Sequence, residues 1–347
     1  MKIDPVKFLL TSLARVLAVT LCVSGIVLLA GCNRGRVRVL EVAYVSGVQV
    51  NLRDRVAVAY EKVGVVKNGD RVEVLDHDRR FVKVRTAAGV TGWMEQRYLV
   101  SQDVFDQLQR LTKENANDPV QGQATARNDT NLHVEPGRDT EHLYQILLGE
   151  KVSLLKRGTA EKPGAVAPRP GVKTGDKKEP VPVIEDWWLV RDSHDRVGWV
   201  LGRMIDLDVP LDVAQYAEGQ RIVAFFVLNR VQDEDKKVAQ YLTIVTEPKD
   251  GLPFDFNQIR VFTWNVKRHR YETAYRERME GVLPVTVSQE NFDKEGVLPV
   301  FAIRVQDDSG NVTERKYKLN TPIVRRVYAP GEEPVHAVPK RAVRRRR

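Results

Sequence analysis

The sequence predicts an all-β protein with two small barrels, a third β-rich domain that forms a sandwich or barrel, and a signal helix at its N-terminus. Short runs such as RVEV (71–74) alternate apolar and polar residues, the period of a half-buried strand. A pattern in residues 48–99 returns in residues 128–205. In the last third of the chain, three pairs of such runs each bracket a polar turn. Strands are therefore expected in every folded segment.

Residues 1–31 have the features of an export signal. Lys2 and Lys7 give a positive start, and no charged residue occurs from Val16 to Gly31. As a helix this stretch would span about 24 Å, less than the roughly 30 Å of a bilayer core, because each residue adds about 1.5 Å. A basic start, a short apolar run and small residues before a cleavage position are typical of a signal peptide.

Cys32 follows this segment, and LAGC (29–32) resembles the lipobox of bacterial lipoproteins. The resemblance implies that the Cys32 thiol carries a lipid and that the signal is cut before it. The chain would then be a membrane-anchored lipoprotein of the cell envelope, exposed to the periplasm. Asn33 is not the aspartate associated with inner-membrane retention, which slightly favours the outer membrane. A short uncleaved anchor with a buried cysteine remains the alternative.

Arginines lie at both ends of the folded part. Arg34, Arg36 and Arg38 belong to a basic tether of residues 32–40, and the proline-rich tail 329–347, expected to be disordered, ends in Arg344 to Arg347. These arginines are candidates for contact with anionic lipid. The chain carries a net charge of +9, but residues 32–324 contribute only about +1. We therefore expect no nucleic-acid partner.

The internal repeat has a constant register. Asn51-Leu52 corresponds to Asn131-Leu132 at an offset of 80, and Gly92-Trp93 corresponds to Gly198-Trp199 at an offset of 106. The register jumps once, by 26 residues, which places an insertion in the second copy at residues 156–183. Its five prolines and four glycines predict a disordered loop at a hairpin tip.

Each copy resembles the bacterial SH3-like (SH3b) domain, over residues 41–100 and 124–209. The resemblance rests on Asn-Leu-Arg or Asn-Leu-His, a Gly-Asp or Gly-Glu hairpin, an aromatic residue opening the fourth strand, and Gly-Trp in the last strand. It implies two small barrels that bind peptidoglycan or peptide segments of an envelope protein. It also makes Trp93 and Trp199 core residues.

Aromatic residues are the candidates for a binding groove, because their rings give apolar contact at low entropic cost. Trp187 and Trp188 must point to opposite faces of a strand, so one of them is expected to be exposed beside the insertion. In the first copy the candidates are Tyr60, Phe81 and Tyr98.

The remaining segments are a linker and the last domain. Residues 101–123 predict a short helix and a linker, because Val104, Leu108 and Leu111 have helical spacing and Ser101 is placed to cap the helix. We expect this helix to pack on the first barrel. Residues 210–328 contain three hairpins, with turns at QDEDK, KRHR and DSGN, and predict the sandwich or barrel.

No catalytic residue, metal site or cofactor is expected. Both cysteines, Cys22 and Cys32, precede the folded part, which therefore has no cysteine nucleophile, disulfide or thiolate metal site. Neither H-E-x-x-H nor G-x-S-x-G occurs. The main hypothesis is a non-enzymatic adaptor. Two alternatives stay open: a structural interaction protein with its partner site on residues 210–328, and a wall-processing enzyme that uses a carboxylate pair.

Overall fold

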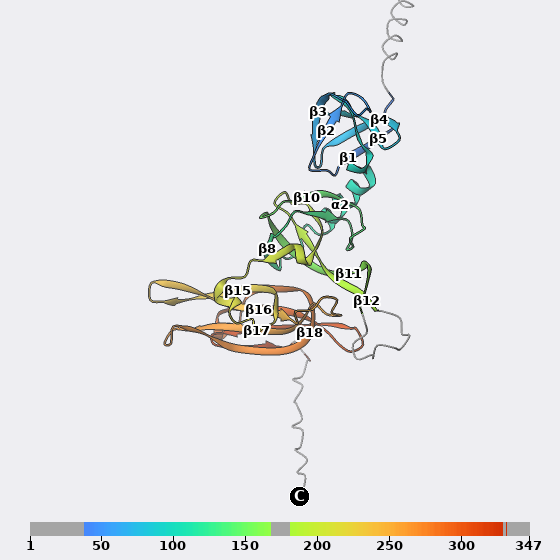
Figure 1. Cartoon of the computed structure of the whole chain (residues 1–347). Coiled ribbons are helices and arrows are strands. Elements are labelled where there is room, and N and C mark those ends of the chain that lie inside the picture. The colour runs from blue at the N-terminus through green and yellow to red at the C-terminus, as the bar shows by residue number, and fades with distance from the viewer. Residues whose placement is uncertain (1–37, 168–180, 329–330, 332–347) are drawn as a thin grey trace, which may run out of the picture. The chain divides into compact units, whose positions relative to one another are not determined.

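The computed structural model describes residues 38–167, 181–328 and 331, and these residues confirm the all-β prediction (Figure 1). They form three seven-stranded antiparallel sheets. They divide into two compact units, one made of residues 38–43, 50–66 and 71–97 and the other of the remainder. No helix among the described residues is long and apolar enough to cross a membrane.

The first sheet has the strand order β3-β2-β6-β5-β4-β1-β7. Alternate apolar residues of its strands form a core in which Leu52, Val84 and Met94 are at most 1% exposed. Its elements are β1 (Glu41–Val45), β2 (Gln49–Arg53), β3 (Lys62–Lys67), β4 (Arg71–Asp78), β5 (Phe81–Thr86), β6 (Thr91–Glu95), the 3-10 helix η2 (Gln96–Tyr98) and β7 (Leu99–Ser101).

The second sheet repeats the first, with the order β10-β9-β13-β12-β11-β8-β14. The last three elements of each sheet have the same lengths and lie 106 residues apart. Leu132, Val190 and Val200, the counterparts of the core residues named above, are completely buried. The elements are β8 (Gly122–Ala126), β9 (Thr130–His133), β10 (His142–Ile146), β11 (Lys151–Ala167), β12 (Val181–Arg191), β13 (Val197–Leu201), η3 (Gly202–Met204) and β14 (Ile205–Leu207).

The insertion in the second copy is not wholly the disordered loop that its composition predicts. β11 continues to Ala167 and β12 begins at Val181, so both ends of the insertion are strand. The two arms pair antiparallel, with one irregularity between Glu161 and Val166. Backbone hydrogen bonds extend this hairpin without a buried apolar face, which is why composition alone failed to predict it. Residues 168–180 lie outside the described part.

The predicted linker helix is α2 (Gln102–Glu114), which buries Val104 and Leu108. Ser101 occupies the N-cap position, but its side chain makes no capping hydrogen bond. The Thr112 hydroxyl accepts a hydrogen bond from the backbone N–H of Val197 at 3.0 Å. This contact attaches α2 to the second sheet, a partner that the sequence did not predict.

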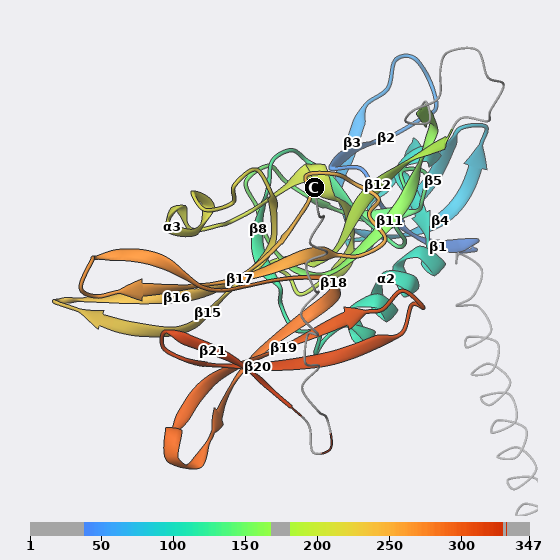
Figure 2. The same cartoon turned by 90° about the horizontal axis from the view of Figure 1, so that it is seen from below.

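The third sheet is a meander in the order β15-β16-β17-β18-β19-β20-β21 (Figure 2). The three predicted hairpins are confirmed by the pairings β15 with β16, β17 with β18, and β19 with β20. The short helix α3 (Leu211–Ala214) and the 3-10 helix η4 (Asp293–Glu295) accompany it. The strands are β15 (Arg221–Asp233), β16 (Lys236–Thr246), β17 (Phe256–Asn265), β18 (Arg270–Asn291), β19 (Val297–Gln306), β20 (Val312–Asn320) and β21 (Ile323–Val327).

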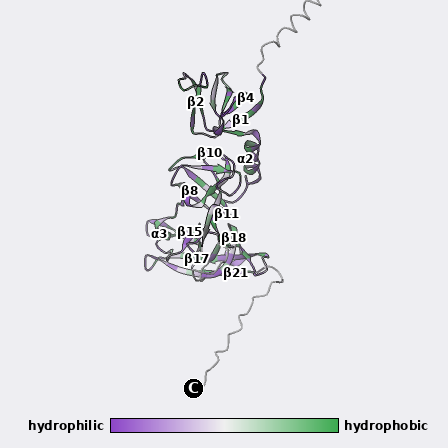
Figure 3. Ribbon diagram, turned by 45° about the vertical axis from the view of Figure 1, so that its right-hand side comes forward, coloured by the Kyte–Doolittle hydropathy of each residue, from purple (hydrophilic) through white to green (hydrophobic). Residues whose placement is uncertain are grey.

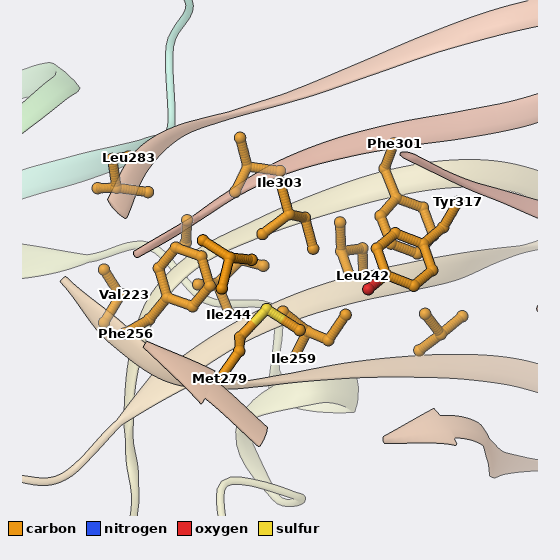
Figure 4. Close-up of a cluster of buried hydrophobic side chains, with 14 of the residues drawn as sticks. Val223, Leu242, Ile244, Phe256, Ile259, Met279, Leu283, Phe301, Ile303 and Tyr317 are labelled. Atoms are coloured by element: carbon orange, nitrogen blue, oxygen red, sulfur yellow. The ribbon is translucent and has the colours of Figure 1, made fainter. Parts of the chain in front are cut away.

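The long strand β18 folds this sheet around one core. It pairs with β17 up to Gly281 and with β19 from Gly281 onward. A Cβ atom at Gly281 would lie 2.1 Å from the ring of Phe256, so only glycine fits at this change of partner. Phe256, Phe301 and Tyr317 are central to the enclosed core (Figure 4). Exposed positions of β18, such as Arg276, Arg278 and Glu280, are hydrophilic, and hydrophilic and hydrophobic residues both occur along the strands of this sheet (Figure 3).

Candidate ligand-binding site

In the first barrel, one arginine joins two of the predicted groove residues. Arg53 ends β2, and its guanidinium carbon lies 4.2 Å from the ring centre of Tyr60 and 5.1 Å from that of Phe81. Tyr60 is 40% exposed, whereas Phe81 is 6% exposed and serves as the base of the cluster. An exposed ring beside a guanidinium can stack on planar groups and pair with carboxylates. We call Arg53, Tyr60 and Phe81 the Arg53 cluster.

The second barrel carries different residues at the three equivalent positions. By the offsets of the repeat, these are His133, Thr140 and Trp187. The His133 Nδ1 atom lies 2.9 Å from the Thr140 hydroxyl, and its ring meets Trp187 edge-on at 5.2 Å. Burial, together with the neighbouring His142, lowers the pKa of His133 to about 4, so its imidazole is neutral at neutral pH.

This cluster makes Trp187 a core residue. Its side chain is 2% exposed, because His133 covers one edge of the ring. The expectation that Trp187 presents an exposed ring to a groove was therefore wrong. Trp187 does contribute to the wall of a cavity.

That cavity has a volume of about 280 Å³ and lies within the second barrel. Its wall includes Arg138, whose guanidinium donates to the two carboxylate oxygens of Glu185 at 2.6 and 2.8 Å. The hydrogen bond from Arg138 is the main cause of the lowered pKa of Glu185. A second arginine, Arg203, also lines the cavity.

Trp188 is not exposed beside the insertion, contrary to expectation. The two tryptophans do point to opposite faces, but the outer face is covered by the third sheet. Trp188 is half-buried and packs against the core that contains Phe256 and Leu283. It therefore joins the second barrel to the C-terminal domain, and its ring also lines a cavity at this junction.

A buried ionic cluster strengthens the same junction. Asp186, which precedes these tryptophans on β12, accepts hydrogen bonds from Arg157 at 2.6 Å and from Arg221 at 2.8 Å. It also accepts one from the backbone N–H of Gly251 at 2.9 Å. Arg157 bonds Asp255 at 3.2 Å as well. The Asp186 and Arg157 side chains are only 4% and 6% exposed, so the charges satisfy each other.

Asp186 and Asp255 are the carboxylate pair that an enzyme hypothesis would point to. They line a second cavity of about 290 Å³. Burial would raise the pKa of Asp186, but the bonds from Arg157 and Gly251 lower it overall. Burial raises the pKa of Asp255, and its partners offset only part of this rise. Each of the four carboxylate oxygens accepts a hydrogen bond, so both carboxylates help to hold the junction together.

The other predicted residues have the following places. Tyr98 ends η2, is partly buried and belongs to the second compact unit, not to that of the Arg53 cluster. Arg38 is exposed. Cys32, Arg34, Arg36 and Arg344 to Arg347 lie outside the described residues. Within the described part, no group of three or more histidine, cysteine or acidic side chains is arranged to hold a metal ion.

Residues 47–100 match the family model of the bacterial SH3 domain. No curated protein matches the chain. Similar solved structures include NlpC2 from Trichomonas vaginalis, with 9% identity and a TM-score of 0.17 over 81% of this chain and 97% of that chain. An NlpC/P60 family protein from Bacillus cereus has 11% identity and a TM-score of 0.23 over 81% and 95%.

Sequence reasoning missed the residues that connect these features. Arg53 and His133 occupy the same position of the Asn-Leu-x motif, and their difference was visible in the alignment of the two copies. The Asp186 cluster gave no local signal, because its members come from β11, β12 and the segments around β15 and β17.

Proposed function

We propose that this chain is a non-enzymatic lipoprotein of the cell envelope, whose two SH3-like barrels bind peptidoglycan or peptide segments of an envelope protein. The observation that carries the proposal is the bacterial SH3 domain at residues 47–100, since this family suggests peptidoglycan binding. The equal strand order of the two sheets supports a second SH3-like barrel.

The Arg53 cluster is the binding surface that we assign to the first barrel. Tyr60 offers a partly exposed ring, and Arg53 holds a guanidinium over it. A ring with few rotatable bonds gives contact area at low entropic cost, and the guanidinium supplies a directional charge for a carboxylate or amide. Phe81 supports the arginine from below and so acts as a positioning residue.

Attachment to the membrane is assigned to Cys32. The lipobox-like LAGC sequence supports transfer of a diacylglycerol to its thiol, cleavage before this residue and acylation of the new amino group. Mass spectrometry of the N-terminal peptide is the direct test. A mature chain that begins at Cys32 with an added diacylglycerol is expected, and an unmodified chain that retains residues 1–31 would contradict this part of the proposal.

Retention on purified cell-wall sacculi tests the binding function. We expect the full chain to sediment with sacculi at low salt, and Tyr60→Ala to reduce its apparent affinity by roughly 5- to 30-fold, the loss typical of one aromatic contact. Tyr328→Ala is a matched control, because Tyr328 is 39% exposed and also lies beside an arginine, with 5.0 Å between Arg326 and its ring.

Absence of retention of the unmodified chain would refute wall binding. Equal losses in Tyr60→Ala and Tyr328→Ala would refute the assignment to the Arg53 cluster. Release of soluble wall fragments during the incubation would replace the adaptor hypothesis with an enzymatic one.

A further inference from the structure

One arginine position has different neighbours in the two barrels. In the first barrel, Arg97 Nε lies 2.9 Å from a carboxylate oxygen of Glu95. At the offset of 106, the second barrel keeps the arginine as Arg203 and has Leu201 in place of the glutamate. Among residues 38–167 and 181–328, the Arg203 side chain forms no hydrogen bond and no ion pair. The second barrel therefore retains the cation without the direct carboxylate contact that it has in the first barrel. Arg203 instead acts at longer range on Glu185, whose pKa its charge helps to lower.

The Arg203 guanidinium lines the cavity of about 280 Å³ described above and also the junction cavity of about 290 Å³. The other arginine of the wall, Arg138, is already committed to Glu185 at 2.6 and 2.8 Å. His133 adds a neutral ring, since burial keeps its pKa near 4. The charge available to a ligand in this cavity is thus concentrated on Arg203.

Asp129 adds a second requirement on the ligand. One of its carboxylate oxygens accepts the backbone N–H of Leu148 at 2.8 Å. Its other oxygen can accept a further donor, and Asp129 lines the same cavity. A group that carries only negative charge would meet repulsion there. A group that presents a carboxylate to Arg203 and an N–H donor to Asp129 would fit both, and the end of a peptide is such a group.

We propose that this cavity, the Arg203 pocket, binds the free carboxylate of a cell-wall peptide through Arg203. Its volume is slightly below the roughly 300 Å³ of small ligand sites, which suits one peptide end better than a glycan segment. That the peptide comes from the cell wall rests on the proposed function. That the pocket binds a carboxylate rests on Arg203 and the other residues that line it. The wall of the pocket includes Asp129, Asn131, His133, Leu201, Arg203 and Met204.

The test uses the full chain and a synthetic wall stem tetrapeptide, prepared once with free carboxylates and once with amidated carboxylates. We expect calorimetric titration to show at least about 10-fold tighter binding of the free acid, as one charge-assisted pair provides. Arg203→Gln should remove this difference, while Arg203→Lys should retain part of it, because lysine keeps the charge and loses the planar fork.

Arg127→Gln is the matched control. Arg127 is an exposed arginine of the same barrel, lies 3.2 Å from Asp206 and lines the junction cavity instead of the Arg203 pocket. We expect this variant to bind both peptides as the unmodified chain does. A loss equal to that of Arg203→Gln would move the carboxylate to the junction cavity and overturn the assignment.

Failure of this inference is distinct from failure of wall binding. If sacculi retain the chain but the two peptides bind equally, or Arg203→Gln binds the free acid unchanged, the carboxylate site is refuted and wall binding stands. If sacculi do not retain the chain but the free acid binds in an Arg203-dependent manner, wall binding fails and the carboxylate site is supported.

Discussion

Replacing Asp186 with alanine should separate the second barrel from the C-terminal domain. Asp186 joins Arg157 of its own barrel to Arg221 and to the backbone of Gly251, which belong to the following domain. The substitution removes the two carboxylate oxygens that accept these three hydrogen bonds. It also leaves Arg157, 6% exposed, with Asp255 as its remaining carboxylate partner in the described part of the chain.

The expected cost is about 3–5 kcal/mol in the free energy of unfolding, as for other buried ion pairs that lose one partner. Most of it comes from Arg157 and from the Gly251 N–H, because both lose a short bond in a buried setting. Arg221 contributes less, since its side chain is 37% exposed and water screens its charge.

Urea unfolding followed by tryptophan fluorescence measures the loss, since Trp188 lies at the junction. Hydrogen exchange at Gly251 locates it, because that amide loses its acceptor. Asp208→Ala is the control: Asp208 pairs with Lys151 at 2.7 Å, but its side chain is 31% exposed, so we expect a cost below about 1 kcal/mol. An Asp186→Ala variant as stable as Asp208→Ala would refute the view that the junction depends on this carboxylate.

Three further outcomes are expected. The His269 ring donates a hydrogen bond to the Asp233 carboxylate, which raises the pKa of His269 above its usual 6.5. This pair therefore stabilises the fold below pH 6.5, and its contribution is lost as pH rises through the raised value. Asp233→Asn should return the pKa of His269 toward 6.5 in an NMR titration. Gly281→Ala should lower the unfolding free energy by about 1–3 kcal/mol or more in urea denaturation, because its Cβ would overlap the Phe256 ring. Gly122→Ala is the control and should cost less, because its Cβ would meet only the tip of the Leu207 side chain.

Local signals sufficed for the all-β class, for the three C-terminal hairpins and for the repeat. Alternation of period two reports which residues face a core, and the offsets of 80 and 106 needed only identities such as Gly92 and Gly198. The hairpin arms of the insertion could not be predicted in the same way. Their stability comes from backbone pairing between Lys156–Glu161 and Ile184–Leu189, which leaves little trace in composition.

The site was harder to predict because exposure depends on contacts between distant segments. The sequence correctly predicted that Trp187 and Trp188 point to opposite faces of a strand. Strand periodicity does not predict which other segment covers the outer face. Here the third sheet covers it, through a core formed more than 60 residues later in the chain, around Phe256. Tyr60 and Phe81 were predicted from their type alone, and only the structure adds the arginine between them.

The two barrels show how one scaffold can supply two surfaces. At one position the first barrel places Arg53 over Tyr60, and the second buries a neutral His133 against Trp187. At another, the first barrel pairs Arg97 directly with Glu95, and the second has Leu201 in place of that glutamate. The arginine that we assign to ligand binding therefore differs in position between the barrels. It is Arg53 at the end of β2 in the first barrel and Arg203 in the 3-10 helix η3 in the second. Two copies that bound the same group in the same way would not require this exchange. Substitution of Arg53 and substitution of Arg203 are therefore expected to weaken the binding of different chemical groups, which titrations of the two variants with the same set of peptides would reveal.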